Sequence, residues 1–599
     1  MGRSYSTERP IGLLALSFVA VGVGVITGFG AIFFRGLIGL IHNVAYFGLF
    51  SYVYDANLYT APSPWGIAIV LVPVLGGLGV VFLVSKFAPE ARGHGVPEVM
   101  DAIFYQDGKI RPVVAIVKSL ASALAIGTGA AVGREGPIIQ IGASLGSTVG
   151  QLIRMDAWQR ITLVAAGAGA GIAATFNTPI GGVMFAIELM MPEVSVRTFL
   201  PVALATGTAT FIARLFLGIR PAFEVPAKLF LSDQPASLDA ILLYVLLGAI
   251  IGVAATGFIR GLNGADKFFE KVRNPYLRHA AGMLVVGVMM YAFLRGSGHY
   301  HIDGVGYSTV QDILLGGMIA APFMILLFVS KLAATIFSLG SGSSGGIFSP
   351  SLFMGATLGG AFGAVAHIIL PLPDITIAAF AMVGMAAMVG GATGAAMTAV
   401  TMIFEMTRDY DIVMPMIVAV AVSIGIRRLL SSENIYTIKL VARRHFIPKA
   451  LHANMFLIRP AGDVMDKNFL VLPHDMEFDA FLRKPEHNGT FCHIIVTNGE
   501  NIAGTMRVNI SLRRGLEGAY TGVTLGDVAN RKFTIAHEED VMFGVIDRMW
   551  RKNASMIIVV RAKGIPHVSD IIGVITKEHV ADSVADSVRP YAEHQGTMM

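Results

Sequence analysis

The stretch Gly133-Arg134-Glu135-Gly136-Pro137 places two adjacent charges in an apolar, glycine-rich part of the sequence, between Lys118 and Arg154. A charged side chain inside a bilayer costs roughly 2.5–3.5 kcal/mol on insertion scales, so such a residue marks a functional site by default. The flanking glycines predict a backbone that leaves the helix, which membranes tolerate only where it is buried in protein or lines a cavity. We therefore expect Glu135 to face an ion path.

The composition excludes an ordinary soluble protein. Of 599 residues, 54% are hydrophobic and 14% are charged, and the mean hydropathy is +0.66. A membrane-spanning helix needs about 20 apolar residues, and several apolar runs here are shorter or broken by glycine. Such runs indicate discontinuous helices around a site at the midplane. The candidate runs are Ile11–Phe34, Trp65–Val84, Val113–Val132, Ile161–Met191, Phe199–Leu217, Leu238–Ile259, Ala280–Leu294, Ala320–Leu339, Leu352–Leu370, Ile375–Phe404 and Ile412–Ile426.

The remaining composition limits the partners and cofactors. The single cysteine, Cys492, excludes an internal disulfide framework and fits a cytosolic tail. The net charge of +5 reflects cytoplasmic Lys and Arg rather than nucleic-acid binding, and the same bias places the C-terminal tail in the cytosol. No Cys/His cluster has metal-ligand spacing, so we expect no metal site.

The membrane part repeats itself. Lys118–Gly150 aligns without gaps with Lys331–Gly363, which predicts two repeats over about 11–217 and 238–430. Each repeat carries a glycine-rich loop that runs into a helix start, at Gly133–Pro137 and at Gly346–Pro350. The N-terminus of a helix favours anions because its N–H groups are free and its dipole is positive there. Two such ends predict an anion site that binds weakly enough for a conduit.

The tail contains a second repeat. Gly462-Asp463-Val464 recurs as Gly526-Asp527-Val528, and each is followed by a short strand, a helical stretch and two β-rich runs. This pattern predicts a tandem α/β module. We expect a membrane domain over 1–438, a linker over 439–460, α/β units over 461–523 and 524–587, and a flexible end over 588–599.

These motifs resemble the CLC family of chloride channels and chloride/proton exchangers over roughly Arg9–Arg444, and the tail resembles a CBS-domain pair. The motifs that carry the resemblance are Gly133–Pro137, Gly345–Pro350, Gly93–Pro97 and Ile435-Tyr436-Thr437. The resemblance implies an all-α polytopic membrane protein with two inverted structural repeats and a C-terminal cytosolic α/β tandem CBS module. It also implies a homodimer in contact with lipid in the cell membrane, here the bacterial inner membrane.

The resemblance assigns roles to individual residues. Glu135 would be the gate, the carboxylate that competes with the anion and the outer carrier of protons. Arg134, Glu135, Gly136 and Pro137 would line the outer anion site through their amides. Gly346, Ile347 and Phe348 would supply the central site, where the amides of Ile347 and Phe348 and the hydroxyl of Tyr436 would bind the anion.

Two residues depart from the family pattern. His94 stands where the family has Ser or Pro, and it is either a hydrogen-bond donor to the anion or an ordinary hydrogen-bonded loop histidine. Leu189 stands where proton-coupled members commonly have a glutamate, immediately after Glu188. We therefore expect passage of chloride and other small anions, gated by Glu135, with weak or no proton coupling. The alternative is a chloride/proton antiporter that uses Glu135 as its outer proton carrier.

Two other classes of protein, a membrane enzyme and a receptor, explain fewer of these sequence features. A membrane enzyme using Glu135 as acid or base lacks a nearby nucleophile or metal cluster, so we expect no enzyme. A receptor with a ligand-sensing tail leaves the duplicated membrane motifs unexplained. CBS pairs often bind adenine nucleotides through Thr or Ser followed three residues later by Asp, but here Thr576 is followed by His579. We expect no required cofactor, and the tail serves as a dimerising or coupling module.

For several single residues, a purely structural role is the alternative to a role in the site. Glu135 could form a structural ion pair with Arg134, although adjacent residues rarely face each other. Tyr436 could be an interfacial aromatic. The remaining polar residues of the apolar runs are interpreted as membrane-edge groups (Glu188 and Glu405) and as lysines snorkelling to the interface (Lys118 and Lys331).

Overall fold

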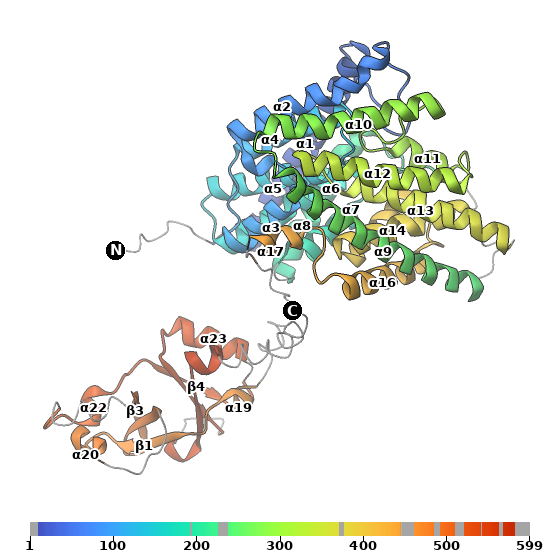
Figure 1. Cartoon of the computed structure of the whole chain (residues 1–599). Helices are drawn as coiled ribbons and strands as arrows, with labels where there is room; N and C mark the ends of the chain where they lie inside the picture. Colours follow the sequence, from blue (N-terminus) through green and yellow to red (C-terminus); the bar gives the residue numbers. More distant parts are fainter. Residues whose placement is uncertain are drawn as a thin grey trace. The chain divides into compact units, whose positions relative to one another are not determined.

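A computed structural model describes residues 10–191, 194–225, 238–370, 376–443, 445, 460–483, 491–509, 520–540, 542–561 and 567–581. The chain divides into two compact units between Ile447 and Pro448 (Figure 1). The predicted end 588–599 and most of the predicted linker lie outside the described residues, and the other domain bounds stay predictions.

The first unit is helical (Figure 1). Its two halves carry their longer helices in the same order along the chain. The first half contains α1 (Leu13–Phe47), η1 (Gly66–Leu71), α2 (Val72–Phe87), η2 (Pro89–Ala91), α3 (Val96–Tyr105), α4 (Val113–Gly127), α5 (Glu135–Leu152), α6 (Ala157–Phe176), α7 (Pro179–Phe185), η3 (Ala186–Met190) and α8 (Val196–Leu217). The second half contains α9 (Leu238–Phe269), α10 (Pro275–Ser297), α11 (Tyr307–Leu314), α12 (Ala321–Ser341), α13 (Phe348–Ile369), α14 (Ile377–Thr393), α15 (Ala396–Thr407) and α16 (Val413–Leu430), and α17 (Thr437–Ala442) follows.

The helices confirm a polytopic membrane protein. Among the described residues, eight helices are long and apolar enough to cross a membrane, and others are shorter. Two predicted runs are not single spans. The run Ile161–Met191 breaks at Asn177 and the run Ile375–Phe404 at Gly394, each with a left-handed backbone (φ +62° and +79°). The glycine-broken pattern predicted such discontinuity, but not the places where it occurs.

Two equivalent short helices lie antiparallel and cap each other. Glu188, near the end of η3, accepts hydrogen bonds from Met397 N (3.2 Å) and Thr398 N (2.8 Å) at the start of α15. Glu405, near the end of α15, accepts from the N–H groups of Ile180 (3.1 Å) and Gly181 (2.7 Å) at the start of α7. An antiparallel pair of equivalent helices is what inverted repeats require.

The tail has the predicted tandem α/β form. The first sheet pairs β1 (Phe469–Pro473) parallel with β2 (Phe491–Asn498), which pairs antiparallel with β3 (Asn501–Asn509). The second sheet repeats this order with β4 (Phe533–His537), β5 (Met556–Val560) and β6 (Ile571–Thr576). The remaining described elements are α19 (Ala461–Val464), α20 (Phe478–Leu482), α22 (Leu525–Val528), α23 (Met542–Arg551) and η4 (Val568–Asp570).

The two leading helices of the tail are exchanged between its units. Ala461 of α19 belongs to the core cluster of the second sheet, together with Ile557 and Ile575. Leu525 of α22 belongs to the core cluster of the first sheet, together with Phe478. The two α/β units are therefore built into each other rather than merely placed in series.

Candidate functional site

Three glycine-rich loops meet at the centre of the membrane unit. Gly133 and Gly346 exchange two backbone hydrogen bonds of 2.7 and 2.6 Å, which join the loop before α5 to the loop before α13. Gly93 donates to Ser343 O (3.0 Å), and Gly345 donates to Gly93 O (3.2 Å). The close approach explains the glycines: a Cβ on Gly136 would lie 2.3 Å from the carbonyl oxygen of His94. Sequence motifs from both halves therefore form one site.

Glu135 lies fully buried at this junction. It is the first residue of α5, and its side chain is 0% exposed. Its Oε1 accepts a hydrogen bond from the Tyr307 hydroxyl (2.5 Å), and its Oε2 accepts from Ser349 N (3.3 Å) in the first turn of α13. A buried carboxylate needs such partners, and the positive end of a helix dipole adds to them. The carboxylate of the first half thus occupies the anion-favouring helix end of the second half.

Tyr307 and Ser349 are site residues that the sequence reasoning missed. Tyr307 begins α11, and its hydroxyl lies 2.7 Å from the Ser349 hydroxyl as well as 2.5 Å from Glu135. Two features of the sequence could have indicated these residues. Tyr307 comes directly after Gly304-Val305-Gly306, which is the second copy of the Gly93–Gly95 motif. Ser349 lies inside the Gly345–Pro350 motif.

Arg134 lies closer to Glu135 than the argument from adjacent positions predicted. Arg134 Nε is 3.9 Å from Glu135 Oε1, and the guanidinium carbon lies 5.2 Å from the centre of the Tyr307 ring. That separation is beyond a hydrogen bond, so the nearest partner of Glu135 is Tyr307. A pure Arg134–Glu135 ion pair therefore does not account for the arrangement.

His94 and Tyr436 lie next to each other and are buried. Their ring centres are 5.7 Å apart, and they are 2% and 1% exposed. Burial excludes the interpretation of Tyr436 as an interfacial aromatic. Neither ring nitrogen of His94 has a hydrogen-bond partner among the described residues. This contradicts the interpretation of His94 as an ordinary hydrogen-bonded loop histidine, because unpaired buried polar atoms are costly.

The predicted amide donors lie at helix starts. Ile347 is the N-cap of α13 and Phe348 its first residue, and both are buried, as is Gly346 in the loop before them. The first amides of a helix have no acceptor inside that helix, so they are available to an anion. In the other loop Arg134, Glu135 and Gly136 have N–H groups, whereas Pro137 has none, so its predicted amide contribution is wrong.

The interpretation of Lys118 and Lys331 as snorkelling residues is wrong. Both are 0% exposed. Lys118 Nζ donates to Ala91 O (3.0 Å) and Gly93 O (2.8 Å), and Lys331 Nζ donates to Ile302 O (2.9 Å) and Gly304 O (2.8 Å). Each lysine therefore fixes the loop that carries its own copy of the glycine motif.

Glu188 and Glu405 are likewise more than membrane-edge groups, because each caps a helix of the other half, as described above. Leu189 lies partly buried against the apolar core immediately after Glu188. In the second half the residue after Glu405 is Met406, which is fully buried. Neither half has an acidic side chain at this position.

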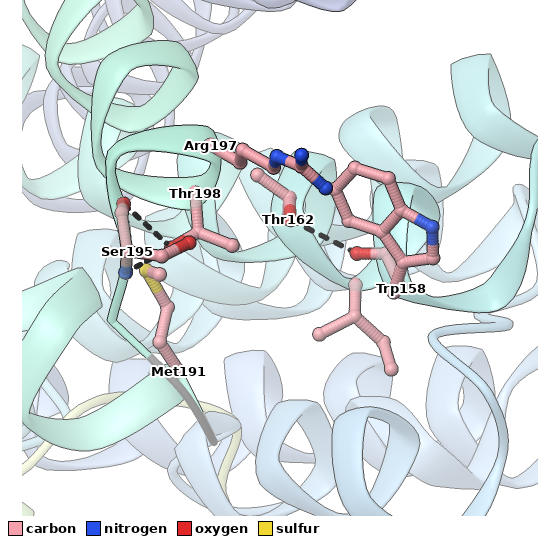
Figure 2. A pocket seen from close by; sticks show the side chains of 7 residues that line it. Trp158, Thr162, Met191, Ser195, Arg197 and Thr198 are labelled. Atoms are coloured by element: carbon pink, nitrogen blue, oxygen red, sulfur yellow. Dashed lines mark hydrogen bonds between the residues drawn. The ribbon is translucent and has the colours of Figure 1, made fainter. Parts of the chain in front are cut away.

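Two cavities lie away from the centre. One of about 250 Å³ is lined by Trp158, Ile161, Thr162, Met191, Ser195, Arg197 and Thr198 and contains none of the predicted site residues (Figure 2). The other, of about 390 Å³, lies between the two tail units and is lined by Arg507, Thr576 and Glu578 among others. Arg507 and Glu578 form an ion pair there. Thr576 lines the cavity, and His579 stands three residues later where the sequence resemblance predicts an Asp.

Comparison with known proteins supports the resemblance to the CLC family. A sequence model described as "Voltage gated chloride channel" matches residues 76–428. The H(+)/Cl(-) exchange transporter ClcA of Salmonella gallinarum is 31% identical over 463 residues, which cover 75% of this chain and 93% of that protein.

Two solved structures have the same fold. A slow cyanobacterial Cl−/H+ antiporter is 26% identical, with a TM-score of 0.62 over 72% of this chain and 97% of that chain. A eukaryotic CLC transporter is 19% identical, with a TM-score of 0.56 over 95% and 98% of the two chains. The chain belongs to the CLC family: it is a multi-pass membrane protein of a family of anion transporters, with a C-terminal tandem α/β module.

Proposed function

We propose that the protein passes chloride and other small anions across the membrane between its two halves, with the Glu135 carboxylate as the gate. The observation that carries the proposal is the hydrogen bond from Ser349 N to Glu135 Oε2 at the start of α13. There the carboxylate occupies a place that a free anion would otherwise take.

The gate follows from competition for the same donors. While Glu135 is charged, it holds the Tyr307 hydroxyl and the Ser349 amide. Protonation removes the charge that these donors and the helix dipole favour, so the carboxyl group leaves and an anion enters. Arg134 and Gly136 would line the outer site, and the amides of Ile347 and Phe348 the central one.

His94 would donate a hydrogen bond to the central anion beside the Tyr436 hydroxyl. Its unpartnered ring nitrogens support this role, since an anion would satisfy one of them. Loss of one such bond is worth about 1 kcal/mol, or roughly fivefold in affinity. His94→Phe keeps a ring but has no donor, so it should bind chloride roughly fivefold more weakly in calorimetric titration, and unchanged affinity would remove His94 from the site.

The gate is tested with Glu135→Gln in chloride-loaded liposomes. We expect ionophore-dependent chloride efflux that no longer changes with pH, because glutamine cannot be charged. Glu270→Gln, an exposed site, is the matched control and should keep the wild-type pH response. Wild-type efflux no faster than in protein-free vesicles would refute anion transport. Wild-type pH dependence in Glu135→Gln would refute only the gate.

Proton coupling is a separate question with two candidates. Leu189 favours weak or absent coupling, because leucine cannot carry a proton. The names of the relatives, an exchange transporter and an antiporter, favour chloride/proton exchange with Glu135 as the outer carrier. The reversal potential under a pH gradient separates them: a shift that Glu135→Gln abolishes establishes exchange, and no shift establishes an uncoupled conduit.

We further infer a homodimer embedded in lipid, with its tail in the cytosol. The family resemblance and the Lys/Arg bias support this arrangement. Light scattering of the purified protein measures the mass of the complex, and a monomeric mass would contradict the dimer.

A further inference from the structure

Three side chains of the tail come together although they lie far apart in the sequence. Asp466 follows α19, His493 lies on β2, and His579 follows β6. One ligand atom from each lies within 4.8 Å of the others. The Nε2 atoms of His493 and His579 are 3.5 and 3.6 Å from Oδ2 of Asp466, and the two ring centres are 5.1 Å apart. The cluster is therefore compact and faces a common point.

The spacing fits a metal ion. Two ligands bonded at 2.0–2.1 Å with tetrahedral angles lie about 3.4 Å apart, close to both measured nitrogen–oxygen distances. Two imidazoles and one carboxylate are a ligand set for Zn²⁺ and similar divalent transition metals. Calcium and magnesium prefer oxygen ligands alone, so the cluster does not suit them.

Burial favours His493 as a ligand. The side chain is 4% exposed, and its Nδ1 has no hydrogen-bond partner in the described part of the chain. A neutral imidazole has one nitrogen lone pair to offer to a metal ion. The nearby Arg507 is itself paired with Glu578.

Binding has two identifiable costs, and the first is that a metal at Nε2 of His493 leaves the ring proton on the buried Nδ1, which has no partner among the described residues. The second concerns His579. Thr576 N donates to His579 Nδ1 at 3.3 Å, which places the ring proton on Nε2. A metal at Nε2 requires the proton to be on Nδ1 instead, so this contact must be given up. The contact is long, and the ion would supply stronger bonds than the one lost.

We propose that Asp466, His493 and His579 form a site for a divalent transition-metal ion, with Zn²⁺ the best fit, that ties the two α/β units of the tail together. Asp466 and His493 precede the second sheet, whereas His579 follows its last strand. The departure that removes the ribose-contacting Asp from the second unit also supplies the third ligand. An ion that binds only this arrangement stabilises it by mass action. This proposal replaces the expectation that the chain has no metal site.

The test uses the full-length protein in detergent, with any affinity tag removed and bound metal stripped by a chelator. Calorimetric titration with ZnCl₂ should show about one saturable site per chain. Asp466→Asn, His493→Gln and His579→Gln should each weaken binding tenfold or more. His567→Gln is the matched control, since His567 is an exposed tail histidine paired with Glu500 (3.0 Å) and should leave binding unchanged.

Two results would overturn the proposal. One is the absence of saturable Zn²⁺ binding by the wild type. The other is wild-type affinity in His493→Gln and His579→Gln, which would assign the binding to scattered surface histidines. Asp466 is only partly buried, so Asp466→Asn keeps the test valid if His493→Gln fails to fold. As a second measurement, Zn²⁺ should raise the melting temperature of the wild type but not that of Asp466→Asn; an equal rise in both contradicts the site.

Discussion

The two halves of the membrane unit share their frame but differ at their centre. Lys118 and Lys331 each hold an equivalent loop through two carbonyl groups, and Glu188 and Glu405 cap each other's helices. At the junction, however, Glu135 of the first half aligns with an uncharged phenylalanine in the second. Shared residues therefore build the scaffold, and the residues that differ supply the proposed gate.

The largest expected effect tests whether the frame is really shared. Lys331→Met leaves the carbonyls of Ile302 and Gly304 without a donor among the described residues, at about 1–3 kcal/mol apiece, so we expect a loss of about 2–6 kcal/mol of stability, seen as a lower melting temperature in detergent. Lys118→Met should cost less, because Ser344 and Gly345 still donate to the carbonyls of Ala91 and Gly93. Lys271→Met, at an exposed site, should change little. A loss in Lys118→Met as large as that in Lys331→Met would contradict this difference.

The next effect concerns the difference at the centre. Tyr307→Phe removes the 2.5 Å bond to Glu135, and hydrogen bonds to charged groups are worth about 1.5–3 kcal/mol. The Glu135 carboxylate should then leave the start of α13 at least roughly ten times as often, and chloride efflux at neutral pH should rise. The control is Tyr410→Phe, at an exposed tyrosine. Unchanged efflux would mean that Tyr307 does not hold the gate.

A smaller effect is expected from the reciprocal caps. Glu188→Gln and Glu405→Gln keep the shape but remove the charge that favours a helix N-terminus, which costs about 0.3–1 kcal/mol. Both should lower the melting temperature slightly and equally, and chloride should still pass. Loss of transport in Glu188→Gln alone would give that residue a role beyond capping.

The smallest structural change tests the absence of an acidic residue directly after Glu188. Leu189→Glu adds a carboxylate in the first half only, at a partly buried position that should tolerate it. If Leu189 limits coupling, the reversal potential should begin to follow the pH gradient. Leu189→Gln is the neutral control. Equal reversal potentials in both variants would mean that proton coupling does not depend on this position.

The sequence predicted the fold class, the duplication and the central motifs. Glycine and proline in fixed register reveal a loop before a helix, because few other residues allow that backbone. The direction of a side chain is not visible in the same way. In the sequence, a lysine whose side chain reaches water cannot be distinguished from one that, like Lys118, donates a hydrogen bond to a buried carbonyl.

Contacts between segments far apart in the chain were the other feature that the sequence did not predict. Tyr307 meets Glu135 across 172 positions, and no local pattern encodes that meeting. The tail cluster is similar, since His493 lies on β2 whereas His579 follows β6, and the two lack the short spacing of a familiar metal motif. Such sites appear only once the topology brings their elements together.

The paired hydrogen bonds between Gly133 and Gly346 also have a consequence for biosynthesis. Gly133 leaves the ribosome 213 residues before its partner (346 minus 133). At about 5–20 residues per second, the first loop waits roughly 10–40 s for the groups that complete it. For most of that interval the charge of Glu135 lacks Tyr307, and throughout it lacks the amide of Ser349. The newly made first half must therefore be kept close to water or to the insertion machinery until the second half arrives.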